Sequence, residues 1–244
     1  CRKQNLLMEK TLYLVGLGLC DEQDISLRSI EILKKCDRVF AENYTSRIKE
    51  GTLGRLEKLI NKKIVLLGRE EVEGEKTILD ACAGAKEAEG ERIMQKECGN
   101  GAVALLVPGD PMSATTHVSI FDSAGKKGIC TKIIHSSSIF TAAAGAAGLQ
   151  RYKFGKTATI AYWRKNFEPT SFLDVIKGNL EIGAHTLCLL DIDEELGAMK
   201  PSLAIGILQK AQRRKSAKKR LKKNVFDAKA KIFVLWRVGW EDGK

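Results

Sequence analysis

Residues 103–117 read VALLVPGDPMSATTH, an apolar run that stops at two prolines enclosing a Gly-Asp pair. The run is typical of a strand that is buried on both faces, as in a parallel sheet. Pro108 and Pro111 each have a fixed φ and no backbone N–H, so neither suits the interior of a regular element. The residue before each proline is pushed towards extended geometry. The stretch therefore predicts a stiff loop at the end of a buried strand, and this loop holds the Asp110 carboxylate in one direction.

Strands and helices alternate along the rest of the chain. Further strands are expected at or within 11–19, 38–42, 61–70, 130–135, 156–163, 183–192 and 230–239. The stretches between them show helical spacing of apolar residues or helix-forming composition. This alternation predicts an α/β fold with largely parallel sheets. We expect two α/β domains, residues 8–150 and 151–244, because the alternation restarts near residue 150.

Local chemistry predicts the ends of two helices. One helix is expected within 26–37, with Ser26 as its N-cap. The other is expected from residue 114, and it should stop at Gly125 and Gly128. For Asp110 two roles stay open at this point, because its carboxylate can cap the second helix or face a ligand.

Composition and cysteine usage exclude several classes of protein. The chain has 244 residues, of which 44% are hydrophobic and only four are proline, as in a globular protein. It has no apolar stretch near the roughly 20 residues of a membrane span and no visible signal peptide. We expect Met8 to be the natural start. Seven scattered cysteines without a C-x-x-C pair favour a reducing compartment, the cytoplasm, and three widely spaced histidines predict no metal site.

The basic residues are unevenly distributed. The net charge of +11 comes from 41 basic and 30 acidic residues, and residues 213–223, RRKSAKKRLKK, contain eight basic residues and no acidic one. Such a run can bind nucleic acid electrostatically, or it can be a solvated face. No aromatic residues are interleaved to stack on bases. Because of the charge of this run, we keep as the alternative function a basic adaptor that binds RNA or the ribosome through residues 213–223.

The first predicted strand ends in Gly16-x-Gly18, which is a weak dinucleotide-binding signal. The third glycine of that fingerprint would fall at position 21, which is an aspartate, and the chain has no P-loop or nucleophile elbow. A stronger pattern is shared by several short loops that follow predicted strands: GLGLCD, PGDPMS, HSSSI, LLDI and WRVG. Ligands of parallel α/β sheets bind at the carboxyl ends of the strands. These loops together predict one ligand site.

The motifs GREEVE, PGDPMSATTH, IIHSSSI, GLQRYKFG, HTLCLLDI and WRVG occur in this order along the chain. In sequence and spacing they resemble the diphthine synthases, methyltransferases of the tetrapyrrole methylase-like fold, over about residues 9–240. The resemblance implies two α/β domains with S-adenosylmethionine in the cleft between them. It also implies a homodimer whose substrate is translation elongation factor 2. The methylated group is the amine of a 3-amino-3-carboxypropyl-histidine, which becomes diphthine, and eukaryotic members also make a methyl ester.

The resemblance also implies which residues contact the cofactor. The matching positions are Leu19, Asp110, Ser113, Ser138, Ile139, Leu190 and Val238. Neither the resemblance nor the residues identify a catalytic base. We expect His117 to be a structural helix residue, whereas His135, at a strand end, is either an ordinary hydrogen-bonded histidine or part of the chemistry. The family continues beyond WRVG, so we expect the C-terminal domain of this chain to be shorter than in its relatives.

Overall fold

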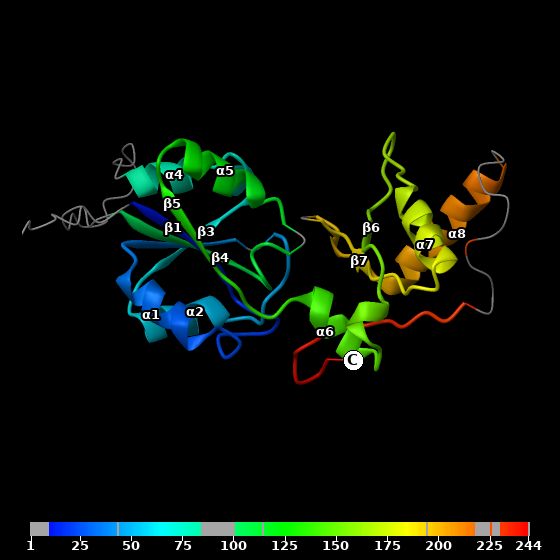
Figure 1. Cartoon of the computed structure of the whole chain (residues 1–244), viewed down its shortest axis with the longest axis horizontal. Helices are drawn as coiled ribbons and strands as arrows, with labels where there is room; N and C mark the ends of the chain where they lie inside the picture. The colour runs from blue at the N-terminus through cyan, green and yellow to red at the C-terminus, as the bar shows by residue number, and fades with distance from the viewer. Residues whose placement is uncertain are drawn as a thin grey trace, which may run out of the picture. The chain divides into compact units, whose positions relative to one another are not determined.

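The computed structural model describes residues 10–42, 44–83, 101–113, 115–193, 195–217, 225 and 230–243. It divides into two compact units, one ending at Ile139 and the other beginning at Phe140 (Figure 1). This division falls after the first residue of helix α6 (Ile139–Ala146), whereas the sequence predicts a domain break after residue 150. None of the described helices is both long and apolar enough to span a membrane.

The first unit contains a five-stranded sheet. Its strands are β1 (Thr11–Gly16), β2 (Arg38–Glu42), β3 (Ile64–Leu67), β4 (Ala102–Val107) and β5 (Cys130–Ile134). They are ordered β3-β2-β4-β1-β5, and every pair is parallel, as predicted. In the register, Gly16 lies opposite Val107 and Val15 opposite Ile134. The carboxyl ends of β4, β1 and β5 therefore lie side by side.

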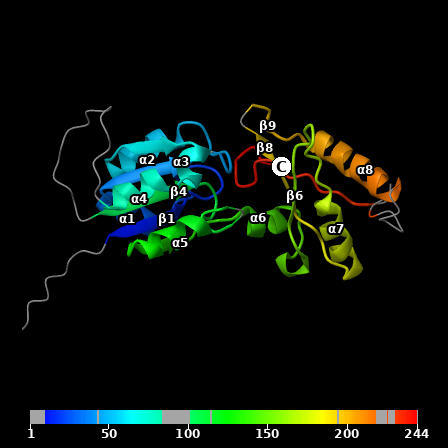
Figure 2. The ribbon, with the colours of Figure 1, turned by 90° about the horizontal axis from the view of Figure 1, so that it is seen from above.

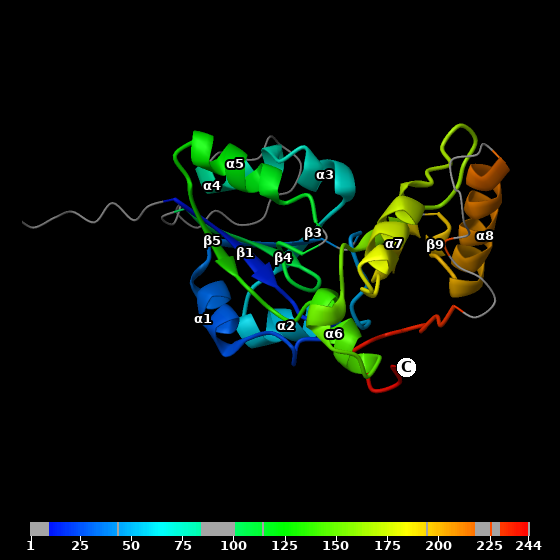
Figure 3. The same cartoon turned by 45° about the vertical axis from the view of Figure 1, so that its right-hand side comes forward.

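Helices cover both faces of this sheet. On one face lie α1 (Leu27–Lys35) and α2 (Thr52–Ile60), and on the other lie α3 (Arg69–Glu73), α4 (Lys76–Ala83) and α5 (Val118–Lys126) (Figure 3). The chain leaves β1 towards α1 on the first face and leaves the adjacent β4 towards α5 on the second. Two neighbouring strands whose connections diverge in this way form a topological switch point, where α/β sheets bind ligands.

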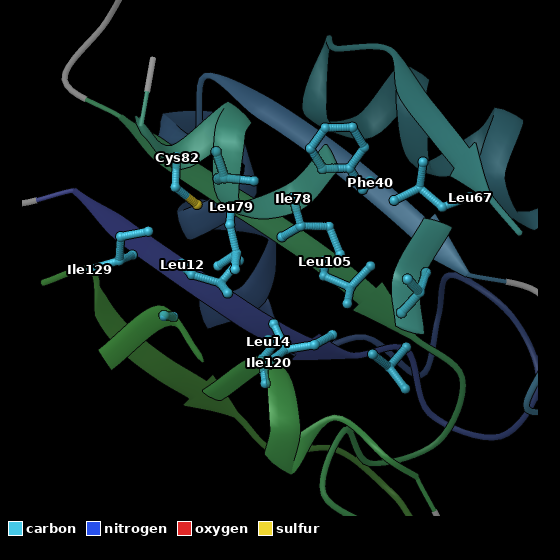
Figure 4. Close-up of a cluster of buried hydrophobic side chains, with 14 of the residues drawn as sticks. Leu12, Leu14, Phe40, Leu67, Ile78, Leu79, Cys82, Leu105, Ile120 and Ile129 are labelled. Carbon is cyan, nitrogen blue, oxygen red and sulfur yellow. The ribbon is translucent and has the colours of Figure 1, made fainter. Parts of the chain in front are cut away.

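The two covered faces explain why the strands are almost continuously apolar. In β1, Leu12 and Leu14 belong to the core beneath α4 and α5 (Figure 4), and Val15 belongs to the core beneath α1 and α2. In β4, Leu105 and Leu106 divide between the two cores in the same way. Because each side chain of this kind contributes about 1.5–3 kcal/mol when fully buried, both cores fix the register of the sheet.

The helix boundaries agree with the sequence prediction in α1 and differ in α5. The Ser26 side chain caps α1 by accepting a hydrogen bond from the Ser29 N–H, as predicted. Helix α5 starts at Val118, later than the predicted residue 114, so the interpretation of Asp110 as its N-cap is wrong. The helix also continues through Gly125 and ends before Gly128, whose φ of 68° is left-handed.

The late start of α5 has a local cause. The Thr115 hydroxyl donates a hydrogen bond to the Pro111 carbonyl oxygen at 2.7 Å, and the His117 imidazole Nδ1 lies 3.3 Å from the same oxygen. These side-chain contacts hold the residues after Pro111 in a turn of their own, a competition with helix formation that is common for short polar side chains.

The strands of the second unit are shorter than those of the first. After α6, the elements of the second unit are the 3₁₀ turn η1 (Arg151–Lys153), β6 (Ala158–Ile160), α7 (Ser171–Glu181), β7 (Cys188–Leu190), β8 (Ile192–Asp193), β9 (Gly197–Ala198) and α8 (Pro201–Ala217). Strands β6 and β7 are parallel, and β8 and β9 form a short antiparallel pair. Helices α7 and α8 pack on β6 through a core that includes Ile160, Leu173 and Ala211 (Figure 2).

The strand predicted at 230–239 is absent from the structure. Residues 230–236 pair with no strand in the described part of the chain, and Ile232, Phe233, Val234 and Trp236 are each about half exposed. Apolar and β-branched composition predicts only that a segment suits a sheet, while a strand also needs a neighbouring backbone to pair with. In the second unit, β6 and β7 form a sheet of two strands that does not include residues 230–236.

Candidate functional site

The loops that follow β1 and β4 join at the switch point. The Gly109 N–H donates a hydrogen bond to the Gly18 carbonyl oxygen at 2.7 Å, and the Gly18 N–H donates to the Gly109 oxygen at 3.2 Å. Both glycines have left-handed backbones, with φ of 80° and 74°, which other residues rarely adopt. The GLGL and PGDP motifs, which are far apart in the sequence, thus form one backbone structure.

Gly16 brings the loop after β5 into the same place. A Cβ atom at Gly16 would lie 2.6 Å from the Gly109 carbonyl oxygen and 2.7 Å from the Ser136 Cβ atom, both closer than real contacts allow. Only glycine therefore lets the backbone of β1 end between the other two loops. The loops after β1, β4 and β5 meet at this point.

Asp24 holds the start of the loop after β1. Its carboxylate oxygen Oδ2 accepts hydrogen bonds from the backbone N–H groups of Leu19, at 2.9 Å, and Cys20, at 2.7 Å. The Asp24 Cβ atom also occupies the space that a side chain at Gly18 would need. Leu19, the predicted cofactor contact in this loop, is consequently fixed at its backbone.

The Asp110 carboxylate connects the loops after β4 and β5. The residue is only 7% exposed, and its Oδ1 accepts hydrogen bonds from the Met112 N–H at 3.0 Å and the Ser113 hydroxyl at 3.3 Å. Its Oδ2 accepts from the Ser136 N–H at 3.2 Å and lies 2.7 Å from the His135 Nδ1. A carboxylate has about four lone-pair positions, and all of them are used. Asp110 thus acts as a clasp between two loops.

These contacts also control the charge of Asp110. Burial alone would raise the pKa of its carboxyl group, but the hydrogen bonds from the Met112 N–H, the His135 imidazole and the Ser136 N–H together hold that pKa below its usual value. Asp110 is therefore an ionised acceptor at neutral pH.

Five of the seven predicted cofactor contacts belong to this edge of the first unit. Leu19 follows β1, Asp110 and Ser113 follow β4, and the buried Ser138 and the first residue of α6, Ile139, follow β5. The other two belong to the second unit. Leu190 ends β7, and Val238 lies in a turn closed by a hydrogen bond from the Trp240 N–H to the Arg237 oxygen at 2.9 Å.

A second polar group is buried beside the same edge. The carboxylate of Glu42, at the end of β2, and the imidazole of His117, just before α5, are both fully buried, with Oε2 and Nε2 3.4 Å apart. The Thr45 hydroxyl donates a hydrogen bond to the other Glu42 oxygen. Burial, and then the nearby Glu42 carboxylate, raise the pKa of Tyr44 well above its usual range. His117 was expected to be structural, and its burial agrees with that role.

The roles of Glu42 and Ser136 were not predicted from the sequence, which left two roles open for His135. A signal for His135 was present in the sequence, because it ends a predicted strand, as Asp110 follows one. Side chains at the carboxyl ends of parallel strands meet when the strands are close in the sheet. The strand order, which the sequence does not reveal, decides that these two loops are near neighbours.

A family model and individual relatives of known name agree on the family of this chain. The family model described as Tetrapyrrole (Corrin/Porphyrin) Methylases matches residues 11–244. The chain is 43% identical to the diphthine synthase of Methanothermobacter thermautotrophicus over 182 residues, which are 75% of this chain and 63% of that relative. It is 42% identical to the diphthine methyl ester synthase of Bos taurus over 183 residues, which are 74% of this chain and 58% of that relative.

The structural comparison agrees with the sequence comparison. A crystal structure of a diphthine synthase matches with a TM-score of 0.69 and 36% identity, over 84% of this chain and 72% of the other. The chain spans about three fifths of the length of the two curated relatives. These matches confirm the α/β fold class and the resemblance that the motifs carried. The chain belongs to the tetrapyrrole (corrin/porphyrin) methylase family, and within that family it is related to the diphthine synthases.

Proposed function

We propose that this protein is an S-adenosylmethionine-dependent methyltransferase. Its substrate would be the 3-amino-3-carboxypropyl-histidine of translation elongation factor 2, and its product diphthine. The observation that carries the proposal is the pairing of Gly18 with Gly109 at the switch point, which joins the loops that hold three predicted cofactor contacts, Leu19, Asp110 and Ser113. The names of the relatives, diphthine synthase and diphthine methyl ester synthase, support the same substrate.

The residues at this edge fit a cofactor of this kind. A Cβ atom at Gly109 would meet only the Ser137 carbonyl oxygen, at 3.9 Å, so a ligand can approach the backbone there without a side chain in the way. Leu19, Ser113, Ser138 and Ile139 would hold the cofactor, with Asp24 supporting the loop after β1 and Asp110 the loops after β4 and β5. Leu190 and Val238 are the contacts proposed from the second unit. When bound, the cofactor supplies the methyl group.

Methyl transfer to an amine depends mainly on position. The amine lone pair must lie in line with the methyl group, and good orientation can supply up to about 7–11 kcal/mol of the acceleration. Loops that are fixed by backbone hydrogen bonds and by buried Asp110 suit this task, because they are rigid before the ligand arrives. The proposal leaves the end product to experiment, since the names of the relatives include both diphthine and its methyl ester.

The alternative adaptor function gains no support. In the part of the basic run that the structure describes, Arg214 pairs with Glu168, and Lys215 lies 2.6 Å from both oxygens of Asp174. These two cations are therefore engaged inside the second unit. Residues 218–223 lie outside the described residues. The comparisons give methyltransferases, and we do not propose the adaptor.

The proposal also includes a homodimer in the cytoplasm, as the resemblance implies. The free thiols suit a reducing compartment, because the structure leaves Cys20, Cys36, Cys82, Cys130 and Cys188 without disulfide partners. Sedimentation of the purified chain tests the dimer, and fractionation of the source cells tests the location.

Calorimetric titration of the purified chain with S-adenosylhomocysteine tests cofactor binding. Methyl transfer is then tested on elongation factor 2 that carries the 3-amino-3-carboxypropyl-histidine, with mass spectrometry of the modified peptide. Stepwise gain of methyl groups on that peptide is expected, and elongation factor 2 with an unmodified histidine is the control. No heat of binding and no gain in mass would overturn the proposal.

A further inference from the structure

We propose that His135 is the general base of the methyl transfer and that Asp110 orients it. The inference rests on the proposed function and assigns a residue for which the sequence offered two readings. Its basis is the contact between the His135 Nδ1 and the Asp110 Oδ2, at 2.7 Å, at the edge where the cofactor contacts are expected.

The contact determines which ring nitrogen carries the proton. Asp110 is ionised and can only accept, so the His135 Nδ1 must donate. In the neutral imidazole the other nitrogen, Nε2, then has the free lone pair. A carboxylate that fixes the tautomer of a histidine in this way is a recurring arrangement in enzymes that use histidine as a base.

The two partners differ sharply in exposure. The Asp110 side chain is 9% exposed and the His135 side chain is 69% exposed. The anchored edge of the ring therefore points into the protein, and most of the imidazole is open to a substrate. Asp110 cannot turn away, since the N–H groups of Met112 and Ser136 and the Ser113 hydroxyl hold the remaining positions of its carboxylate.

The reaction needs a proton acceptor. The substrate amine resembles an α-amino group, whose reference pKa is about 7.7–8.0, so roughly a tenth is neutral at pH 7. An ammonium nitrogen has no lone pair with which to attack. His135 supplies the missing step, because its Nε2 takes the N–H proton and leaves the lone pair on the substrate nitrogen.

The balance of the reaction is simple. The nitrogen lone pair forms the new N–C bond while the S–C bond breaks, and its electron pair stays on sulfur, which changes from a sulfonium to a neutral thioether. The imidazolium of His135 then releases its proton to water. Each N-methylation yields one proton, so the base works again before each later transfer.

Two carboxylates of this edge, Asp110 and Asp24, are both engaged elsewhere than at Nε2. Asp110 contacts Nδ1, and Asp24, in the loop after β1, uses its Oδ2 for the backbone N–H groups of Leu19 and Cys20. A plain surface ion pair would need neither the buried carboxylate nor its three further hydrogen bonds. The contact between Asp110 and the His135 Nδ1 therefore serves to orient the imidazole ring.

The decisive variant is His135→Asn. The asparagine amide can still donate to Asp110 from the position of Nδ1, but it has no basic nitrogen. We expect single-turnover methylation to be about tenfold slower at pH 7, the factor set by the neutral fraction of the amine, with unchanged affinity for S-adenosylhomocysteine. The deficit should close as the pH rises above the pKa of the amine. The control is His185→Asn, an exposed histidine of the second unit.

A second readout does not depend on activity. The chain has three histidines, so nitrogen-15 NMR spectra of single variants assign each ring. We expect His135 to be in the Nδ1–H tautomer in the wild type and to lose this preference in Asp110→Asn. A dominant Nε2–H tautomer, or a His135→Asn deficit that is equal at every pH, would overturn the inference alone. A wild type that neither binds S-adenosylhomocysteine nor methylates would overturn the proposed function and, with it, the role of His135.

Discussion

The Nε2 of His117 lies 3.4 Å from the Oε2 of Glu42, and both side chains are fully buried. The Nδ1 of the same ring faces the Pro111 carbonyl oxygen, which can only accept, so Nδ1 carries a proton. On the Glu42 side, neither Nε2 nor Oε2 has a hydrogen-bond partner in the described part of the chain, so the two atoms face each other. This contact joins the end of β2 to the loop after β4, and with it the base of the candidate site.

Removal of His117 should therefore take away the group that faces the buried Oε2 of Glu42. We expect His117→Ala to lower the free energy of unfolding by about 3–5 kcal/mol, as for other broken buried pairs. Glu42→Gln should cost much less, because a neutral amide can donate to Nε2. Urea unfolding followed by circular dichroism measures both. Equal losses in the two variants would show that packing, and not the buried charge, stabilises this contact.

A methyl group at Gly16 should disturb the site and the sheet together. The added Cβ would meet the Gly109 oxygen and the Ser136 Cβ atom, so we expect Gly16→Ala to cost about 1–3 kcal/mol of stability and to weaken S-adenosylhomocysteine binding. Gly125→Ala in α5 is the matched control, since nothing lies within 4 Å of its Cβ. This control should be neutral or gain up to about 1 kcal/mol. Thermal unfolding and calorimetry report the two effects.

Asp110 should make the first unit sensitive to acid. A carboxyl group whose pKa is lowered by folding stabilises the fold fully above its ordinary pKa of about 3.9. The stabilisation is lost as the pH falls from there through the lower folded value. We expect the free energy of unfolding to drop less over this range in Asp110→Asn than in the wild type. Asp122→Asn, which changes an exposed pair with Lys126 on α5, should behave as the wild type does.

Asp110 should also matter for cofactor binding. Asp110→Ala removes the clasp between the loops after β4 and β5, and we expect weaker binding of S-adenosylhomocysteine even though the sheet beneath remains. Calorimetry measures the affinity. Unchanged affinity would mean that these loops hold their positions without the carboxylate.

Salt should separate the methyltransferase from the basic adaptor. Affinity for RNA falls steeply with rising salt when phosphate contacts supply it. Apart from Asp110, whose carboxylate is occupied by hydrogen bonds within the protein, the candidate cofactor site is made of glycine backbone, serines and apolar residues, so S-adenosylhomocysteine binding should change little with ionic strength. Titrations of both ligands at low and high salt make the comparison. A steep loss for the cofactor, or strong RNA binding that resists salt, would contradict this expectation.

The sheet of the first unit could be predicted because short stretches of sequence identify its strands. Apolar runs such as 102–107 end in glycine or proline, and the alternation of strands with helices selects a parallel sheet. The family was predictable because its motifs lie in the loops at strand ends. The strand at 230–239 was predicted wrongly, since composition says nothing about whether a partner edge is present.

The side-chain chemistry of the site was less predictable. The contact of Asp110 with His135 depends on strand order, and so does the burial of Glu42 against His117. A helix start at 114 looked reasonable, but the Pro111 carbonyl attracts the side chains of Thr115 and His117 and delays it. These are contacts between distant or competing groups, which a pattern of local propensities does not contain.

The clasp from Asp110 to the backbone of Ser136 has a consequence for how the protein is made. It joins the loops after β4 and β5 across the end of β1, so the first strand of the chain must already lie between the later two. On the ribosome, no nascent chain shorter than about His135 can contain the site. A ligand present during synthesis therefore cannot stabilise shorter nascent chains. It can bind only after the first half of the chain has emerged and β1 lies between β4 and β5.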